Sequence, residues 1–222
     1  MVLRAFALIS AVCISGPALA QAAPHPAAPP ATSPAVPAPP KPGTSEDRGA
    51  LTTAAAVAAL DDTDDPPTYS QGDPRWKNFQ LAHGVSVGKA GCLVVSLFTS
   101  LLQMGYNFDL LSFLRTLADN DLFDRFGRLR WDIQKAIPGL SAERLKLAGT
   151  AALAAAKERI ADGSRVILEV VTSRGTHHWI AVVKMVGDSI IVSDPNGGKI
   201  GTLSDLYGGA RAVTGLSVLT QH

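Results

Sequence analysis

The stretch GCLVVSLFTSLLQMGYN, residues 91–107, has the pattern of a buried helix that begins at a cysteine. Its bulky apolar residues recur three or four positions apart, which is the period of one helix face: Leu93, Leu97, Phe98, Leu101, Leu102 and Met104. Gly105 then ends the apolar run. We therefore expect a core helix whose first residue is Cys92.

Three segments after this stretch are also predicted to be helices. Residues 109–120 begin with a possible cap, Asp109, and they carry an apolar stripe formed by Leu110, Leu114, Leu117 and Ala118. Residues 131–137, WDIQKAI, are predicted to form a shorter helix that Pro138 ends. Residues 150–163, with a run of alanines, are the last of the three.

The apolar pattern changes from helical to alternating after Gly163. Strands are predicted over residues 166–170, 179–186, 189–192 and 215–219, and Gly187-Asp188 is predicted to be a two-residue turn. Because the helices come first and the antiparallel strands follow, we expect an α+β fold. The helix that starts at Cys92 would then pack on a small antiparallel sheet.

The first part of the chain is predicted to direct export and to remain unfolded. Residues 1–20 combine an early Arg, an apolar run too short to span a bilayer and an Ala-Leu-Ala end, as in a secretory signal peptide. Residues 21–68 are dominated by Ala and Pro and are predicted to be a disordered tether, with a short helix at 51–60. The tether is either a spacer or a cleavable pro-segment. A folded domain over residues 69–222 follows, so we expect a periplasmic or secreted protein with no membrane insertion after signal cleavage.

Composition excludes several classes of function. The formal net charge of the chain is +1, and no basic run or Arg-rich helix is present, so no nucleic-acid partner is expected. Gly-rich phosphate loops and paired cysteine ligands are also missing from the sequence, so no cofactor is expected. A zinc site built from Cys92, His177, His178 and Asp194 is the metal alternative, but adjacent residues on a strand point apart. We therefore expect no metal.

Cys92 is the leading candidate for chemistry. Signal cleavage would remove Cys13 and leave Cys92 as the only cysteine, so no intramolecular disulfide could form. A lone cysteine in an oxidising compartment is an inert core residue, an intermolecular link or a reactive thiol. A position at a helix start favours the third interpretation, because unpaired backbone N–H groups and the helix dipole stabilise a thiolate.

Two adjacent histidines are candidates for its partner. His178 stands at the start of the apolar run WIAVVKMV, where it could pair with the thiolate and later protonate a leaving amine. His177 competes with it, and strand alternation suggests that only one of the two shares the side of Cys92. His178 is preferred because it directly precedes the strand core.

Asp194 is the candidate that would orient the imidazole. It ends the strand in IIVSDPNGG, where it could accept the second N–H of the ring or simply shape a tight turn. A strict two-residue turn at Gly187-Asp188 would place it opposite Ala181, on the face of His177. The arrangement therefore needs a β-bulge, or a position of Asp194 just beyond the ladder. Asn196 is the alternative orienting residue.

Gln71 is the fourth candidate. It precedes the cysteine in SQGDPRW, and its amide could donate to a developing oxyanion together with the backbone N–H of Cys92. Two tryptophans, Trp76 and Trp179, either shape a pocket or pack in the core.

The order Gln71, Cys92, His178, Asp194 resembles the double-glycine-peptidase-like, bacteriocin-processing-like branch of the papain-like cysteine peptidases. The run QGDPRW, residues 71–76, is similar to the Gln-x-Asp-x-Arg-Trp element of that branch. The resemblance covers the predicted folded domain. It implies a papain-like fold with Gln71 as oxyanion donor, Cys92 as nucleophile, His178 as base and acid, and Asp194 as the orienting group.

The sequence also departs from that branch. Leu93, Val94 and Val95 precede Ser96, where the branch often has Thr followed by Ser soon after the cysteine, which affects the expected substrate fit. Members of the branch that are fused to a transporter cleave leader peptides. This sequence shows no transporter segment, so we do not expect the same substrate here.

The predicted function is therefore that of an exported cysteine peptidase that hydrolyses amide bonds through an acyl-thioester. The expected partner is a peptide or protein substrate, with cell-wall peptide included. Two alternatives share the fold: a peptidoglycan amidase or endopeptidase, and a non-catalytic binding module. The sequence does not determine the cleavage specificity or the oligomeric state. It also does not determine whether the acyl group passes to water or to another amine.

Overall fold

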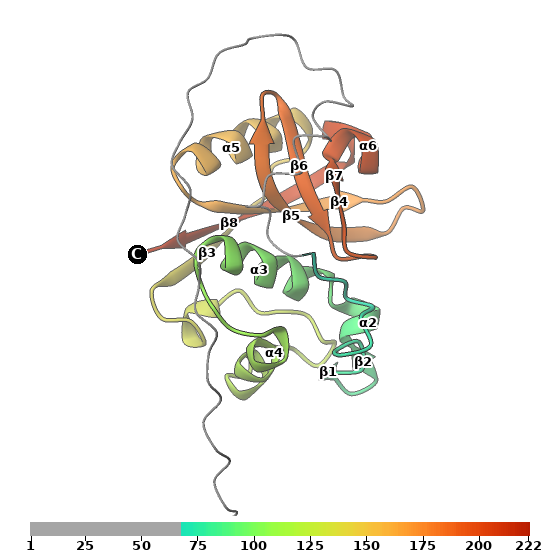
Figure 1. The fold of residues 1–222 in the computed structure, drawn as a ribbon, viewed down its shortest axis with the longest axis vertical. Coiled ribbons are helices and arrows are strands. Elements are labelled where there is room, and N and C mark those ends of the chain that lie inside the picture. Colours follow the sequence, from blue (N-terminus) through green and yellow to red (C-terminus); the bar gives the residue numbers. More distant parts are fainter. Residues whose placement is uncertain (1–67) are drawn as a thin grey trace, which may run out of the picture. The chain divides into compact units, whose positions relative to one another are not determined.

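The computed structural model describes residues 68–222 (Figure 1). The predicted signal peptide, the tether up to residue 67 and the predicted helix at 51–60 lie outside the described residues. The described part of the chain combines helices with a six-stranded antiparallel sheet, so the predicted α+β class is confirmed. None of its helices is both long and apolar enough to cross a membrane.

The first elements lead to the helix that carries Cys92. Two short antiparallel strands, β1 (Gln80–Ala82) and β2 (Val85–Ser86), precede one helical turn, α2 (Val87–Ala90). Helix α3 (Cys92–Gln103) follows, and its predicted start at Cys92 is confirmed. Of the predicted apolar face, Leu97, Phe98 and Leu101 are buried, whereas Leu93, Leu102 and Met104 are only partly buried.

Helix α4 (Leu110–Asp119) also begins as predicted. The backbone N–H of Ser112 donates to the Asp109 carboxylate at 2.9 Å, which caps the helix start. The predicted apolar stripe is wrong at one position, because Ala118 is exposed and Phe113 is buried instead. Phe113 contributes its ring to a stack with Phe108, so the stripe turns toward that ring.

The helix predicted over residues 131–137 is wrong, because only a 3-10 turn, η2 (Ile133–Lys135), forms there. Ile137 precedes Pro138, and the proline ring disfavours helical geometry at the residue before it. With so few residues available, a full α-helix does not propagate. The helix predicted over residues 150–163 is confirmed as α5 (Gly149–Ala161).

All four predicted strands belong to the main sheet. They are β4 (Arg165–Val171), β5 (His177–Val186), β6 (Ser189–Asp194) and β8 (Val213–Gln221). The strand order is β3-β8-β4-β5-β6-β7, and every neighbouring pair is antiparallel. The predicted turn joins β5 to β6, with Gly187 at a φ of 57°.

Both edge strands and one short helix were not predicted. They are β3 (Leu140–Leu145), β7 (Lys199–Thr202) and α6 (Leu203–Tyr207), and a 3-10 turn, η3 (Gly209–Ala212), follows α6. Edge strands have one neighbour and are partly exposed, so their sequences show little alternation.

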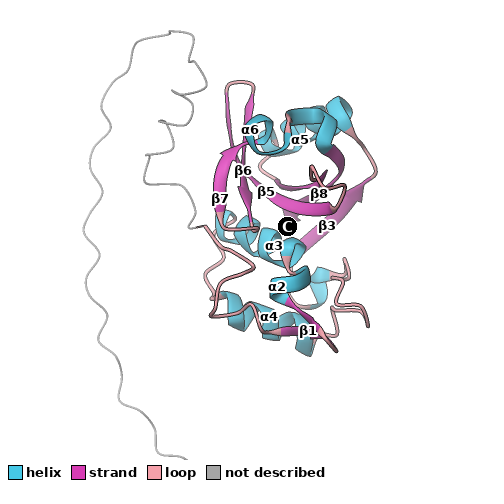
Figure 2. Cartoon of the chain, turned by 90° about the vertical axis from the view of Figure 1, so that its right-hand side faces the viewer, coloured by secondary structure: helices cyan, strands magenta, loops and turns pink. Residues whose placement is uncertain are grey.

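The sheet separates two hydrophobic cores. On one face Ile167 packs with the apolar residues of α3 and α4. On the other face Val166 and Leu168 pack with residues of α5 and α6. Figures 1 and 2 show α3 on one side of the sheet and α5 and α6 on the other.

Polar contacts attach α3 to the backbone of β5. Ser96 Oγ donates to the carbonyl of Trp179 at 3.0 Å, and Gln103 Nε2 donates to the carbonyl of Val183 at 2.7 Å. Ser96 lies about one turn after Cys92 and Gln103 is the last residue of the helix, so the two bonds set the position of α3 along the strand. The start of α3 is thereby held beside the start of β5.

Candidate active site

Cys92 is a free, partly exposed cysteine at the first position of α3. The residue before it has to be glycine for packing reasons. A Cβ at Gly91 would lie 2.5 Å from the carbonyl oxygen of Val87 and 2.6 Å from its Cγ1. The missing side chain lets α2 approach the start of α3 closely and so positions Cys92.

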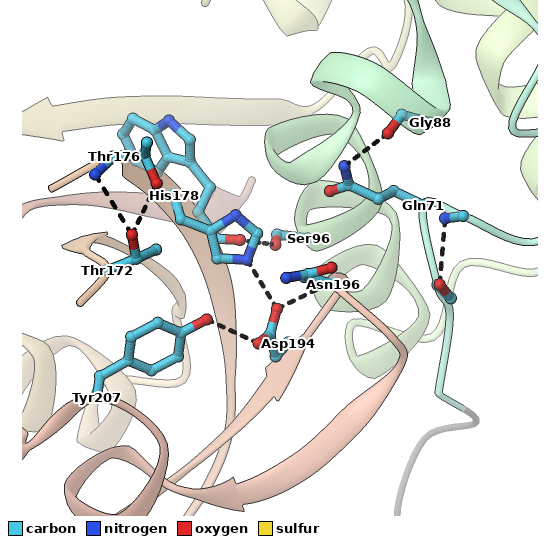
Figure 3. Close-up of polar contacts among 12 residues, drawn as sticks. Gln71, Gly88, Ser96, Thr172, Thr176, His178, Asp194, Asn196 and Tyr207 are labelled. Carbon is cyan, nitrogen blue, oxygen red and sulfur yellow. Dashed lines mark hydrogen bonds and ion pairs between the residues drawn. The ribbon is translucent and has the colours of Figure 1, made fainter. Parts of the chain in front are cut away.

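His178 lies between Cys92 and Asp194. Its Nε2 is 2.7 Å from Asp194 Oδ1, and Cys92 is close enough to the ring to raise its pKa. Because Nε2 is engaged by the carboxylate, Nδ1 is the nitrogen left for Cys92. His178 is 9% exposed, so the ring is held in one orientation (Figure 3).

The surroundings of His178 favour its charged form. Burial disfavours the imidazolium and by itself lowers the pKa of His178. The hydrogen bond to Asp194 and the electrostatic influence of Cys92 and Asp194 outweigh burial and raise the pKa of His178 to about 9. At neutral pH the ring therefore carries a proton that it can donate.

Asp194 accepts three hydrogen bonds. Its Oδ1 accepts from His178 and from the backbone N–H of Asn196 at 2.7 Å, and its Oδ2 accepts from Tyr207 Oη at 2.7 Å (Figure 3). Burial raises the pKa of Asp194, but the bonds from His178, Tyr207 and Asn196 outweigh burial, and the net effect is a lowered pKa. The carboxylate is therefore kept ionised behind the imidazolium.

Tyr207 is a site residue that the sequence analysis missed. It belongs to α6, where burial and the charge of Asp194 raise its pKa, so its hydroxyl stays a neutral donor. A signal was present, because the side chain of Thr202 accepts from the backbone N–H of Asp205 and caps α6. Recognising that cap would have predicted the helix and placed its tyrosine close to the strand that ends in Asp194.

A β-bulge brings Asp194 to the side of His178. The β5–β6 ladder pairs Lys184 with Ile191, shifts at the next residue, and then pairs Val182 with Val192. Continuing the shifted register sets Asp194 opposite Ile180, which shares its strand face with His178. The bulge that the predicted triad required is therefore present.

His177 lies in a different environment from His178. Its side chain is 64% exposed, and its Nδ1 is 3.1 Å from Glu169 Oε1. His177 nevertheless lines the same cleft as Cys92, so strand alternation alone does not separate the two histidines. Their contacts separate them, because His178 is bonded to Asp194 and has its pKa raised by Cys92, whereas His177 contacts Glu169.

The alternative orienting residue, Asn196, has a supporting role in the structure. Its backbone N–H donates to Asp194, and the backbone N–H of Gly197 donates to the carbonyl of Pro195 at 3.1 Å. Asp194 therefore both contacts the imidazole and shapes the turn that follows it.

Gln71 connects the two halves of the site. Its Nε2 donates to the carbonyl of Gly88 at 3.2 Å, and its backbone N–H donates to the carbonyl of Pro195 at 2.8 Å (Figure 3). The side chain is thus placed beside the turn before α3, while the backbone is bonded to the loop after Asp194. A primary amide has two N–H groups, so one remains for a ligand.

A cleft with a volume of about 590 Å³ opens beside Cys92. Two tryptophans, Trp131 and Trp179, line it with ring centroids 5.8 Å apart. Trp179 also packs against the core, so it combines both roles that the sequence left open. Trp76 is a core residue, with 5% exposure and a bond from its Nε1 to the carbonyl of Ser70.

Within residues 68–222 no three His, Cys, Asp or Glu side chains are grouped as metal ligands. The arrangement is instead that of a cysteine, an imidazole and a carboxylate, with the amide of Gln71 bonded to α2, the turn that precedes α3. Such a set can attack a carbonyl carbon, protonate a leaving nitrogen and bind an oxyanion. No family model matches this chain, and no curated protein matches it.

Proposed function

We propose that this chain is an exported cysteine peptidase of papain-like fold that hydrolyses amide bonds with Cys92 as its nucleophile. The observation that carries the proposal is the position of His178, which is bonded through Nε2 to Asp194 at 2.7 Å and whose pKa is raised by both Asp194 and Cys92. A free cysteine at a helix start, paired with a charged imidazole, is the arrangement that thiol nucleophiles use.

The reaction follows from this geometry in two stages. In the first stage Cys92 Sγ bonds to the carbonyl carbon, His178 gives its proton to the amide nitrogen, and the carbon–nitrogen bond breaks to release an amine. In the second stage neutral His178 takes a proton from water, and the hydroxide adds to the thioester carbon. The carbon–sulfur bond then breaks, which releases a carboxylic acid and restores the thiolate–imidazolium pair.

Gln71 and the start of α3 are proposed to hold the oxyanion. Gln71 Nε2 has one N–H engaged by Gly88 and a second available, and the first backbone N–H groups of a helix have no intrahelical partner. Loss of one such donor lowers kcat by about 10²–10³-fold in enzymes of this type. Gln71→Ala should therefore remain folded and bound to substrate but turn over slowly.

Other observations support the finer parts of the proposal. Helix α3 packs on an antiparallel sheet and holds Cys92 against β5, as the papain-like resemblance implies. Export rests on the signal-peptide pattern of residues 1–20. The alternative, a peptidoglycan amidase or endopeptidase, would use the same chemistry on a different substrate. The same experiment can therefore test both functions.

The test is hydrolysis in water enriched in ¹⁸O, with a mixed peptide library and purified cell wall as separate substrates. We expect one ¹⁸O atom in each newly formed carboxylate, detected by mass spectrometry, and no product with Cys92→Ala or His178→Ala. His222→Ala is the matched control, because this exposed histidine contacts Ser141 and not the cleft.

Two results would contradict the proposal. One is a wild-type protein that cleaves neither substrate, which would favour a binding module. The other is product formation by Cys92→Ala at the wild-type rate, because the sulfur would then take no part.

A further inference from the structure

The cleft beside Cys92 has a cationic rim. Three cationic residues line it, Lys89, Arg128 and Arg144, and Glu169 is the one carboxylate in its described lining. A cleft lined mainly by one sign of charge concentrates ligands of the opposite sign.

The carboxylate of Glu169 is already engaged by other side chains of the protein. Its Oε2 accepts from Arg144 Nη2 at 2.9 Å, and its Oε1 is 3.1 Å from His177 Nδ1. The side chain is 13% exposed, so it is shielded from a ligand. The partner residue on β8 is Gly215, where a Cβ would lie 2.9 Å from Glu169 Oε2, so the glycine makes room for this carboxylate.

Arg144 is held in place by its neighbours, but its guanidinium retains N–H groups that can donate to a ligand. Its guanidinium lies 5.2 Å from the centroid of the Trp179 ring, and its Nη2 is bonded to Glu169. Its side chain is 45% exposed. A guanidinium has five N–H donors, and a planar group with one end fixed is suited to a second carboxylate.

The charges of the other two cationic residues are not neutralised by close contact. Arg128 lies 5.3 Å from the centroid of the Phe126 ring, and Lys89 Nζ donates to the carbonyl of Gly84 at 3.3 Å. Among residues 68–222 neither has a carboxylate within 4.0 Å. Their charges are therefore available to a ligand in the cleft.

The rest of the cleft is apolar. Its remaining lining is largely hydrophobic and includes Leu81, Leu93, Val94, Phe123 and Leu129, together with Trp131 and Trp179. Burying a bulky side chain against this surface is favourable because it removes apolar area from water. A ligand that fits therefore combines an apolar group with a negative charge.

We propose that the cleft selects peptides that carry a carboxylate side chain near a bulky apolar residue, and that Arg144 determines this selectivity. The inference rests on the proposed peptidase function and adds its substrate class. Two sources present this chemistry, acidic protein segments and the carboxylate-bearing peptides of a cell wall.

The first arm of the test measures binding to the Cys92→Ala protein, so it does not depend on turnover. Two synthetic peptides that differ only by Glu or Gln beside a Phe are titrated, and the tryptophan fluorescence of the protein is followed. We expect the Glu peptide to bind about tenfold more tightly, as for one charge-assisted hydrogen bond. The preference should shrink as salt is raised.

Variants then assign the preference to Arg144. Arg144→Gln should abolish it, because the contact to the ligand carboxylate is lost and Glu169 also loses its cationic partner, while binding of the neutral Gln peptide should stay within about twofold. Arg159→Gln is the matched control, because this arginine of α5 is similarly exposed at 42% and pairs with Glu143 away from the cleft. Arg128→Gln is a second variant, which leaves the Glu169 contacts intact and should weaken the preference in part.

The second arm separates the two sources. Soluble cell-wall peptides with free carboxylates are compared with the same peptides after amidation. A preference for free carboxylates in either arm that Arg144→Gln removes supports the inference and identifies the source. Equal binding of charged and neutral ligands in both arms, or a preference that survives in Arg144→Gln, overturns it. If the preference is present and the wild type cleaves nothing, the peptidase proposal fails and the selectivity stands.

Discussion

At the scale of single residues, the candidate site is an arrangement of charges that stabilise one another. His178 is buried, yet its pKa is raised to about 9, because Asp194 and Cys92 offset the loss of water. Asp194 in turn is buried and stays ionised because three donors surround it. The imidazole and the carboxylate are therefore both kept charged near neutral pH.

The raised pKa of His178 predicts how stability depends on pH. The folded value is about 9 and the usual value is 6.5, so the stabilisation is fully present below pH 6.5 and is lost as the pH rises through 9. The difference in unfolding free energy between wild type and His178→Gln should be largest near pH 6 and shrink toward pH 10. Urea denaturation at a series of pH values measures this difference.

His222→Gln is the control for that series, since this histidine is exposed at the end of the chain. A difference between wild type and His178→Gln that stays constant from pH 6 to pH 10 would contradict the ion-pair assignment.

Tyr207 is predicted to contribute through Asp194. Tyr207→Phe removes the 2.7 Å bond to Oδ2 and should cost about 1.5–3 kcal/mol of stability at pH 7, the usual range for a hydrogen bond to a charged group. The loss should diminish as the pH falls and Asp194 becomes protonated, because the lowered pKa of Asp194 contributes stability only above its titration. Chemical denaturation at pH 7 and at pH 3 checks both statements.

Tyr106→Phe is the matched control, because this tyrosine packs against Phe108 and lies outside the triad. If Tyr207→Phe is as stable as wild type at pH 7, the hydroxyl does not support the carboxylate.

At the scale of secondary-structure elements, the bulge at Val183 determines which residues meet. Without it, Asp194 would face the side of His177, since a one-residue register shift moves a strand residue to the other face. Gln103 at the end of α3 donates to the Val183 carbonyl at 2.7 Å. The helix that begins with Cys92 therefore also supports the register that places Asp194 beside His178.

We expect Gln103→Ala to lower both stability and activity. The Val183 carbonyl would lose its side-chain partner, which costs about 1–3 kcal/mol when a group is left unsatisfied away from water. Activity per folded molecule should fall as well, because the β5–β6 register is less well determined. Thermal denaturation and active-site titration of the same samples separate the two effects.

Gln134→Ala, at an exposed position of η2, should change neither quantity. Reduced stability with unchanged activity per folded molecule in Gln103→Ala would show that the bulge persists without this bond.

At the scale of the whole molecule, the site forms where two cores and one sheet meet. The core built on α3 and α4 holds the helix that carries Cys92, and the core on the opposite face packs α6, which carries Tyr207, against the sheet. Gln71 connects these parts through Gly88 and Pro195. The cleft in turn combines residues from α3, β3, β4, β5 and the loop around Phe126.

Local sequence determined the elements that depend on short-range physics. The period of apolar residues predicted α3, α4, α5 and the four strands β4, β5, β6 and β8, because helix and strand repeats are properties of neighbouring residues. The start of α3 at Cys92 and the capping of α4 by Asp109 are local as well. The four residues of the predicted site were also named from sequence, through their order and their resemblance to a family.

Tertiary structure alone decided how those residues meet. The choice between His177 and His178 depends on a bulge and on a helix bonded to a distant strand, and neither leaves a periodic signal in the sequence. Contacts between residues far apart in the chain also determine three other features. These are the bond from Tyr207 to Asp194, the edge strands β3 and β7, and the Arg144–Glu169–His177 cluster. The physical reason is that periodicity reports which face of an element is buried, whereas a site depends on which faces come together and in which register.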